Sequence, residues 1–395
     1  MTQSTWALLA ICLAFAAPVA AGQNAAQSKE PEPPPPVFEL VPEAYIQLDW
    51  RTYPESPVAP GTGRLEFATF EVRRLRAGAA GQWRGVHFEL TLDPQDVDGT
   101  LVKDAYGEFR PGGYEIRFGQ FKPPGSRDYG TSARQTDFLE RSALGRALSA
   151  QRDLGVALHG DIGRHFDYDI GAFFGDNNGS SRRSGLTGAG RLEWEPTSDL
   201  VLAFYGSDGS LSAVESDPEN GLEGRLSSGY RFFENVYVQG RRTRLGGDIE
   251  WSPGSWQVTV ESLRVRDERL EQGVDLDDLP SVVGTGATVT TRWRFATRRD
   301  FALRYEYIGF DDVGSETQMA SVRPRAADVR ARAAQAVTFG GSWGVTRWAR
   351  FMGNAGVEWF SDPRTAPEPG RDGGYWTLGT RLQFELPGNW GLRIR

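Results

Sequence analysis

The residues after Pro42 form short segments in which apolar and polar side chains alternate. In the segment Trp83–Leu92, for example, Val86, Phe88 and Leu90 fall on one face and the polar residues between them fall on the other. A period of two residues is typical of a β-strand whose two faces meet different surroundings. The pattern therefore predicts an all-β chain.

Repeating this reading along the chain predicts about sixteen strands: Ala44–Trp50, Phe70–Ala79, Trp83–Leu92, Leu101–Arg110, Tyr114–Phe121, Asp153–Ile162, Phe166–Phe174, Gly190–Pro196, Leu200–Gly206, Gly240–Trp251, Gln257–Arg266, Ala287–Ala296, Phe301–Phe310, Val337–Trp343, Phe351–Phe360 and Tyr375–Leu386. The connections between them alternate between short turns and longer polar loops. The short ones are Ala80–Gln82, Pro111–Gly113, Gly163–His165, Thr197–Asp199, Pro253–Ser255, Thr297–Asp300 and Gly344–Thr346. This alternation predicts a transmembrane antiparallel β-barrel with short turns and both termini on the periplasmic rim. A soluble β-sandwich or propeller also has many short strands, but it gives no reason for the alternation.

Aromatic residues gather near the short turns of the predicted barrel. They are Trp83, Phe109, Phe166, Trp194, Trp251, Trp256, Phe301, Trp343 and Trp348. Aromatic rings favour the boundary between lipid and water, where an apolar ring and a polar group are both accommodated. For any single ring, ordinary packing on a sheet is an equal alternative, but the clustering favours an interfacial girdle.

One long connection, between the strands that end at Phe121 and begin at Asp153, is unlike the others. It spans about thirty residues and resembles neither a strand nor an ordinary linker. Long loops of this kind within a compact fold are commonly functional. We expect it to fold into the mouth of the barrel and to form a constriction. Of its basic residues, we predict that five line an anion path: Lys122, Arg127, Arg134, Arg141 and Arg146.

Arginines also recur on the polar face of the predicted strands. They are Arg74, Arg76, Arg117, Arg242, Arg244, Arg292, Arg294, Arg304 and Arg381. A charge facing lipid near the middle of the membrane costs about 2–4 kcal/mol, so we expect these side chains to face the lumen. Two interpretations stay open. The arginines form a positive lumenal wall that favours anions, or they pair with acidic residues such as Asp104, Glu193 and Glu306 in a neutral lumen.

The first forty residues predict export. Trp6–Ala17 is apolar and is followed by small residues up to Ala21, which is typical of a secretory signal peptide over 1–21. Residues 22–41 are polar and rich in proline, so we expect a periplasmic spacer there, followed by the barrel domain over 42–395. The only cysteine, Cys12, lies in the predicted signal, which leaves no thiol for disulfides or metal binding after cleavage.

Composition narrows the membrane class further. No segment after the predicted signal has the 18 or so consecutive apolar residues that a spanning helix needs, which excludes a helical transporter. Barrel strands alternate between lipid and lumen, so a mean hydropathy of −0.45 is compatible with a barrel.

Six stretches, RRLRAG, LVKDAYGEFR, IRFGQFKPP, DFLER, RDLGVALHG and YDIGAFFGD, resemble the phosphate-selective porin O/P family. The resemblance covers most of the chain after the spacer. It implies a sixteen-stranded barrel in the bacterial outer membrane, surrounded by lipid and lipopolysaccharide and usually trimeric, in which Lys122, Arg127, Arg134 and Arg141 belong to the constriction loop. The solutes that it implies are small anions, phosphate and polyphosphate among them. The chain departs from the family pattern because it continues past Phe384 to Arg395.

Other functions fit the sequence less well. An outer-membrane hydrolase needs a nucleophile beside a base, and the only histidines are His87, His159 and His165, none with a metal-binding or catalytic spacing. We therefore expect no catalytic residues, metal, cofactor or nucleic-acid partner. A non-selective porin and a structural barrel that does not conduct remain the alternatives to an anion-selective porin.

Overall fold

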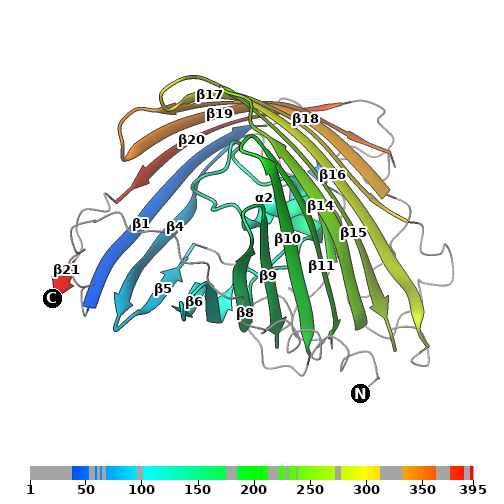
Figure 1. The fold of residues 1–395 in the computed structure, drawn as a ribbon. Helices are drawn as coiled ribbons and strands as arrows, with labels where there is room; N and C mark the ends of the chain where they lie inside the picture. Colours follow the sequence, from blue (N-terminus) through cyan, green and yellow to red (C-terminus); the bar gives the residue numbers. More distant parts are fainter. Residues whose placement is uncertain are drawn as a thin grey trace.

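The computed structural model is a closed antiparallel β-barrel of sixteen strands (Figure 1). It describes residues 38–52, 58–59, 63–64, 68–95, 101–174, 185–211, 222–226, 231–236, 239–271, 277–311, 332–361, 374–386 and 392–394. The barrel strands are β1 Phe38–Thr52, β4 Ala68–Trp83, β5 Val86–Leu92, β6 Val102–Phe109, β7 Tyr114–Phe121, β8 Asp153–Ile162, β9 Phe166–Phe173, β10 Thr187–Thr197, β11 Leu200–Leu211, β14 Gly240–Trp251, β15 Trp256–Arg269, β16 Leu279–Ala296, β17 Arg299–Phe310, β18 Arg332–Gly344, β19 Ala349–Phe360 and β20 Tyr375–Glu385. Each pairs with its neighbours in chain order, as the sequence predicts.

Outside the barrel order lie two short hairpins, β2 Val58–Ala59 with β3 Gly63–Arg64 and β12 Leu222–Arg225 with β13 Arg231–Val236. Among the described residues, no helix is both long and apolar enough to cross a membrane. The predicted signal peptide lies outside the described residues, as does the predicted spacer up to residue 37, and β1 begins four residues before the predicted boundary.

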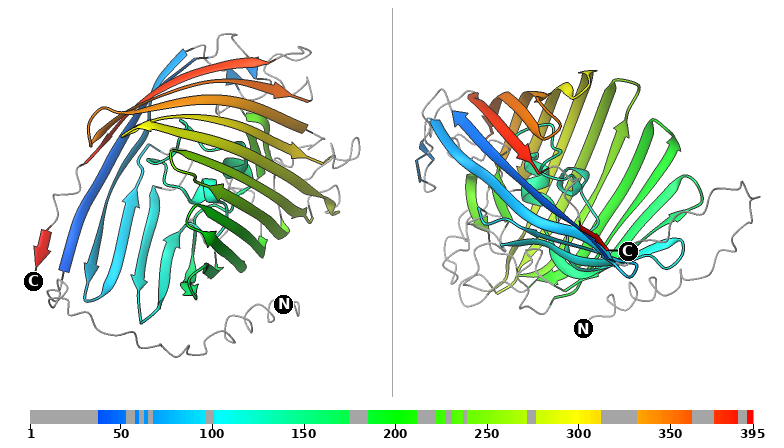
Figure 2. Two further views of the ribbon diagram at one scale, coloured as in Figure 1. Left: turned by 45° about the horizontal axis from the view of Figure 1, so that its top comes forward. Right: turned by 90° about the vertical axis from the view of Figure 1, so that its left-hand side faces the viewer.

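The first and last barrel strands close the cylinder. β1 pairs with β20 from Tyr45 opposite Glu385 to Thr52 opposite Leu378. Below this seam the chain returns as β21, Leu392–Ile394, which pairs with the first three residues of β1 (Figure 2). β21 thus takes the place of β20 beside the first residues of β1 and covers that part of the strand edge.

The short turns lie on one rim, and six of the seven fall within a few residues of the predicted places. The exception is the first. The predicted turn at Ala80–Gln82 is wrong, because these residues lie within β4, which runs on to Trp83. The chain reverses instead at Arg84 and Gly85, whose φ angles of 49° and 84° suit a two-residue hairpin turn.

The barrel is apolar outside and charged inside, as expected. On β20, Leu378, Leu382 and Phe384 are exposed on the outer face, whereas Arg381 and Gln383 between them are each 1% exposed and face the interior. Of the nine aromatic residues predicted to form a girdle, all except Phe301 are exposed. Several stack in pairs near the short turns, such as Trp256 on Trp293 at 5.7 Å between ring centroids. This outer face suits lipid, and the inner face suits water and ion pairs.

Residues 122–152, here called the inner loop, fold into the barrel (Figure 1). The loop contains a helical turn, α2 (Arg127–Gly130), and a short π-helix, η1 (Leu144–Leu148). Leu144 and Leu148 are fully buried in a cluster with wall residues such as Leu263 and Ile308. A Cβ atom on Gly286 would lie 2.9 Å from Leu148, so this part of the wall accepts the loop because it lacks a side chain. The loop fills one side of the lumen.

Candidate functional site

The inner loop is fastened near its start by a carboxylate on β15. The two oxygens of Glu261 accept the backbone N–H groups of Arg127 and Asp128, each at 3.0 Å. The Tyr205 hydroxyl on β11 donates to the same carboxylate at 2.7 Å. The first turn of α2 therefore has a fixed place against the wall, and so does Arg127.

The segment Asp137–Ser142 packs the inner loop against β18 and β20. Phe138 packs against Gly340 on β18, where a Cβ atom would lie 3.0 Å from the ring. Leu139 packs in the same way against Gly379 on β20, with a corresponding distance of 2.6 Å. Both glycines allow an approach that a larger residue would block. The segment Asp137–Ser142, which contains the DFLER stretch, is here called the docking segment.

A cavity of about 560 Å³ lies between the inner loop and the inner face of β1, β4–β7, β9 and β10. It is the candidate pore. Its basic lining residues are Arg76, Arg117, Lys122, Arg127, Arg134, Arg152 and Arg191, and its acidic ones are Glu43, Glu89, Asp104, Asp169 and Glu193. The lining thus holds seven basic and five acidic side chains.

Most of the arginines in this cavity are paired. Arg152 donates to both oxygens of Asp104 at 2.9 and 2.8 Å. Arg191 donates to both oxygens of Asp248 at 2.6 and 3.0 Å. Arg117 also has carboxylate partners, and its guanidinium lies 4.8 Å from the ring centroid of a neighbouring tyrosine. Two-fold hydrogen bonds of this kind fix the guanidinium groups in place.

Lys122 differs from these arginines because its hydrogen-bond partners are neutral. Its ammonium group donates to the carbonyl oxygens of Gly130 at 2.9 Å and Thr131 at 3.1 Å, and it lies 5.4 Å from the ring centroid of Tyr129. Burial, followed by the nearby positive charge of Arg141, lowers the pKa of Lys122 well below its ordinary value. Lys122 therefore has no carboxylate among its hydrogen-bond acceptors. Among the described basic side chains of this cavity, its positive charge, when present, is the one that acidic groups neutralise least.

Of the fourteen predicted anion-path residues, five line the cavity: Arg76, Arg117, Lys122, Arg127 and Arg134. Of these, Arg76 pairs with Asp93 at 2.9 Å, Arg127 pairs with Glu250 and Arg134 lies 3.5 Å from Glu43. The nine that do not line it are Arg74, Arg141, Arg146, Arg242, Arg244, Arg292, Arg294, Arg304 and Arg381.

Most of these nine residues either pair with other residues of the barrel wall or hold the inner loop in place. Arg242 donates to both oxygens of Asp267 at 3.0 Å within the wall. Arg244 on β14 donates to a loop carbonyl at 2.9 Å, and Arg141 braces the loop from within by donating to two of its own carbonyls. Burial lowers the pKa of Arg141 to about 10. Arg292 pairs with Asp137 at 3.0 Å.

Four arginines at the site are not among the fourteen predicted anion-path residues. Arg152 and Arg191 line the cavity, and Arg51 and Arg73 lie at the docking segment. For Arg73 the reason is a β-bulge, which shifts the register of β4 against β1 beyond Gln47 and makes Arg73 the extra residue. A strict period of two gives no signal of a bulge. Arg191, which alternates with apolar residues, did have the expected signal.

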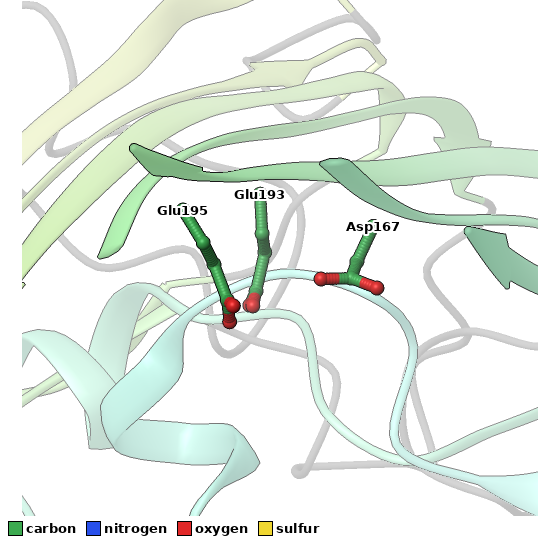
Figure 3. A group of neighbouring side chains, drawn as sticks. All are labelled: Asp167, Glu193 and Glu195. Atoms are coloured by element: carbon green, nitrogen blue, oxygen red, sulfur yellow. The ribbon is translucent and has the colours of Figure 1, made fainter. Parts of the chain in front are cut away.

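A group of three carboxylates, Asp167, Glu193 and Glu195, lies near the short turns between β8 and β11 (Figure 3). One oxygen from each lies within 4.8 Å of the others. Glu193 is already paired with Arg191 at 2.6 Å. The group adds negative charge to this rim of the cavity.

The hydrolase alternative gains no support from the histidines. His165 lies at a short turn, where its Nδ1 is 2.8 Å from the carbonyl oxygen of Glu195. Within the described part of the chain, no hydroxyl is hydrogen-bonded to His87, His159 or His165.

Comparison with known proteins places the chain among outer-membrane channels. The model of the family described as phosphate-selective porin O and P matches residues 47–352. No match was found among curated protein sequences. Among solved structures, OmpT of Vibrio cholerae is 11% identical with a TM-score of 0.60, covering 89% of this chain and 98% of its own. The outer membrane channel DcaP of Acinetobacter baumannii is 11% identical with a TM-score of 0.60, covering 88% and 97%. At these identities the structures show a shared barrel fold.

Proposed function

Because the chain belongs to the phosphate-selective porin O and P family and is an outer-membrane porin, we propose that it lets small anions diffuse passively through the cavity beside the inner loop. The observation that carries the proposal is the excess of basic over acidic side chains in this cavity. The path runs between the inner loop and the half of the wall that the loop leaves open.

Within this path, Lys122 is the residue we propose to attract anions most strongly. Its hydrogen bonds go to carbonyl groups, so its charge is not consumed by an ion pair. Arg127 and Arg134 supply further positive charge from the loop. Arg127 shares its charge with Glu250 and Asp248, and Arg134 shares its charge with Glu43. The other cavity arginines are positioned by carboxylates and act mainly as hydrogen-bond donors to a passing anion.

The energies suit passage better than capture. A unit charge about 7 Å from an anion attracts it by roughly 0.6 kcal/mol in bulk water and about 2.4 kcal/mol at an effective dielectric constant of 20. Such sites recruit an anion without holding it, as a conducting pore requires. Phosphate is the first solute to test, since the family description names it and its oxygens accept the hydrogen bonds that these donors offer.

A non-selective porin is the second candidate. It is favoured by the same ion pairs, because Arg117, Arg152 and Arg191 are all compensated by carboxylates. In that case the lumen is polar and nearly neutral, and size alone decides what passes.

We also propose a homotrimer in the membrane. The support is the family and the trimer form of Vibrio cholerae OmpT, which is 11% identical with a TM-score of 0.61, covering 89% of this chain and 100% of its own. Cross-linking followed by electrophoresis without heating tests this: a band at three times the monomer mass supports the trimer.

The selectivity proposal is tested by the reversal potential of purified protein in planar bilayers under a tenfold KCl gradient. Wild type should prefer chloride, and Arg127→Gln or Arg134→Gln should reduce that preference. Arg242→Gln is the matched control, because Arg242 lies in the wall away from the cavity. A potential near zero with open channels favours the non-selective porin, and potassium preference refutes the anion path. Silent protein supports the structural barrel.

A further inference from the structure

The most concentrated set of ion pairs in the described chain surrounds Glu140 of the docking segment. Its side chain is 2% exposed and lies between the inner loop and the wall strands β1, β4 and β20. Five guanidinium groups lie within 4 Å of its carboxylate: Arg51 at 2.7 Å, Arg73 at 2.5 Å, Arg74 at 2.9 Å, Arg146 at 3.7 Å and Arg381 at 3.9 Å. Four come from the wall, and Arg146 comes from the loop itself.

Two other acids of the described chain lie beside these arginines. Asp49 on β1 accepts two hydrogen bonds from Arg381, at 2.6 and 2.8 Å, and two from Arg51, at 3.2 and 2.6 Å. Glu71 lies 3.7 Å from Arg51 but is nearly half exposed. Among the described residues of the cluster, Glu140 is thus the carboxylate that all five arginines contact.

The charge of Glu140 is secured by this environment. Burial alone would raise the pKa of the Glu140 carboxyl, but the surrounding arginines, Arg73 and Arg74 foremost, hold the pKa well below its ordinary value. The carboxylate is ionised throughout the neutral range. Removing its charge takes away the one carboxylate of the described residues that all five guanidinium groups contact, and breaking a buried ion pair on one side is strongly unfavourable.

The position of Glu140 in the loop gives this charge a mechanical role. At its start the loop is held through backbone N–H groups on Glu261, and Ala143 donates its backbone N–H to Glu306 at 2.9 Å. Both carboxylates lie on the β15–β17 side of the barrel. Glu140 ties the loop to β1, β4 and β20 instead, and β1 and β4 are among the strands that border the cavity.

We propose that Glu140 is a positioning residue of the pore, whose ion pairs with the β1, β4 and β20 arginines hold the inner loop clear of the cavity. This inference rests on the proposed function, because it assumes a conducting path beside the loop. Without the carboxylate, mutual repulsion among the arginines releases the docking segment, and the loop then enters the path intermittently.

The test is single-channel recording of Glu140→Gln beside wild type. We expect brief closures to become at least tenfold more frequent in the variant. Asp267→Asn is the matched control, because Asp267 is also a buried carboxylate paired with an arginine, Arg242, and that pair lies within the wall. The control should close as rarely as wild type.

A disulfide lock separates loop movement from a general loss of order. The ideal Cβ of Gly286 lies 3.0 Å from the Cβ of Leu144, close to the range that a disulfide spans after a small shift. In Glu140→Gln, oxidised Leu144→Cys with Gly286→Cys should restore the closure frequency of wild type, and reduction should raise it again. Closures that persist in the locked protein would overturn the inference.

An unchanged closure frequency in Glu140→Gln also overturns the inference and leaves the proposed function intact. A wild-type protein that never conducts refutes the proposed function instead. Should Glu140→Gln fail to form a barrel, Glu140→Asp keeps the charge but withdraws it by one methylene. Closures at least threefold more frequent in Glu140→Asp then support the inference, and wild-type behaviour contradicts it.

Discussion

Replacing Lys122 should change the ion preference of the pore more than replacing any paired arginine of the cavity. Lys122→Met removes the charge and keeps a flexible side chain of similar length. Lys122→Arg keeps the charge and serves as the control. Because the ammonium group of Lys122 is bonded to carbonyl oxygens, no carboxylate hydrogen-bonded to it is left behind when the charge is removed.

The size of the effect follows from the cavity. A sphere of 560 Å³ has a radius of about 5 Å, so an ion at its centre passes within about 7 Å of the ammonium nitrogen. At that distance the charge attracts an anion by roughly 0.6 kcal/mol even at the dielectric constant of water, and it repels a cation equally. The two effects together are roughly 1.2 kcal/mol, or about a sevenfold change in the permeability ratio.

The assay is the reversal potential in a KCl gradient, measured at the lowest pH at which the barrel stays folded, so that protonation of Lys122 is favoured. Lys122→Met should lower the anion-to-cation permeability ratio about sevenfold, and Lys122→Arg should leave it near the wild-type value. Equal ratios in wild type and Lys122→Met would refute the reasoning, because the unpaired charge would then have no influence on permeating ions.

Three further predictions concern pH, packing and the outer face. Because burial lowers the pKa of Lys122, the wild-type anion preference should fall with rising pH before an ordinary lysine loses its charge, whereas that of Lys122→Arg should not; parallel curves would exclude Lys122 as the titrating group. Leu148→Ala opens a hole in the cluster that holds η1, at a cost of about 2–5 kcal/mol, so open-channel current noise should increase, and wild-type noise would show that the loop does not depend on this contact. Leu382→Arg puts a charge on the outer face at a cost of about 2–4 kcal/mol and should reduce the fraction of heat-modifiable barrel on gels, whereas Leu382→Met should not; equal fractions would argue that Leu382 does not face lipid.

The barrel could be predicted from the sequence because its strands obey one local rule. Outward and inward residues alternate, as Leu382 and Arg381 do, and the short turns carry glycine, proline and polar residues. The rule gave the wrong position for the first short turn, between β4 and β5. The strand continues through Gly81, and the chain turns only at Arg84 and Gly85. Both of these residues have positive φ angles, which period-two alternation does not reveal.

The site was less predictable, because it depends on which wall residues the inner loop meets. The sequence shows that Arg141 and Lys122 belong to one long loop, but not that the first is turned onto loop carbonyls while the second lines the cavity. Nor does it show that Glu140, placed among arginines far apart in the chain, meets five of them. Contacts between distant segments require the closed barrel, and local periodicity carries no information about them.

The central claim, that positive charge dominates the path beside the inner loop, is tested most directly by the reactivity of a cysteine placed there. Ser132 lines the cavity, and Cys12 is the only native cysteine, so Ser132→Cys provides a single reporter once Cys12 is removed. Its rates of reaction with anionic and cationic methanethiosulfonate reagents are divided by their rates with a free thiol. The anionic reagent should then react at least several-fold faster, and equal rates or a faster cationic reagent would contradict the claim.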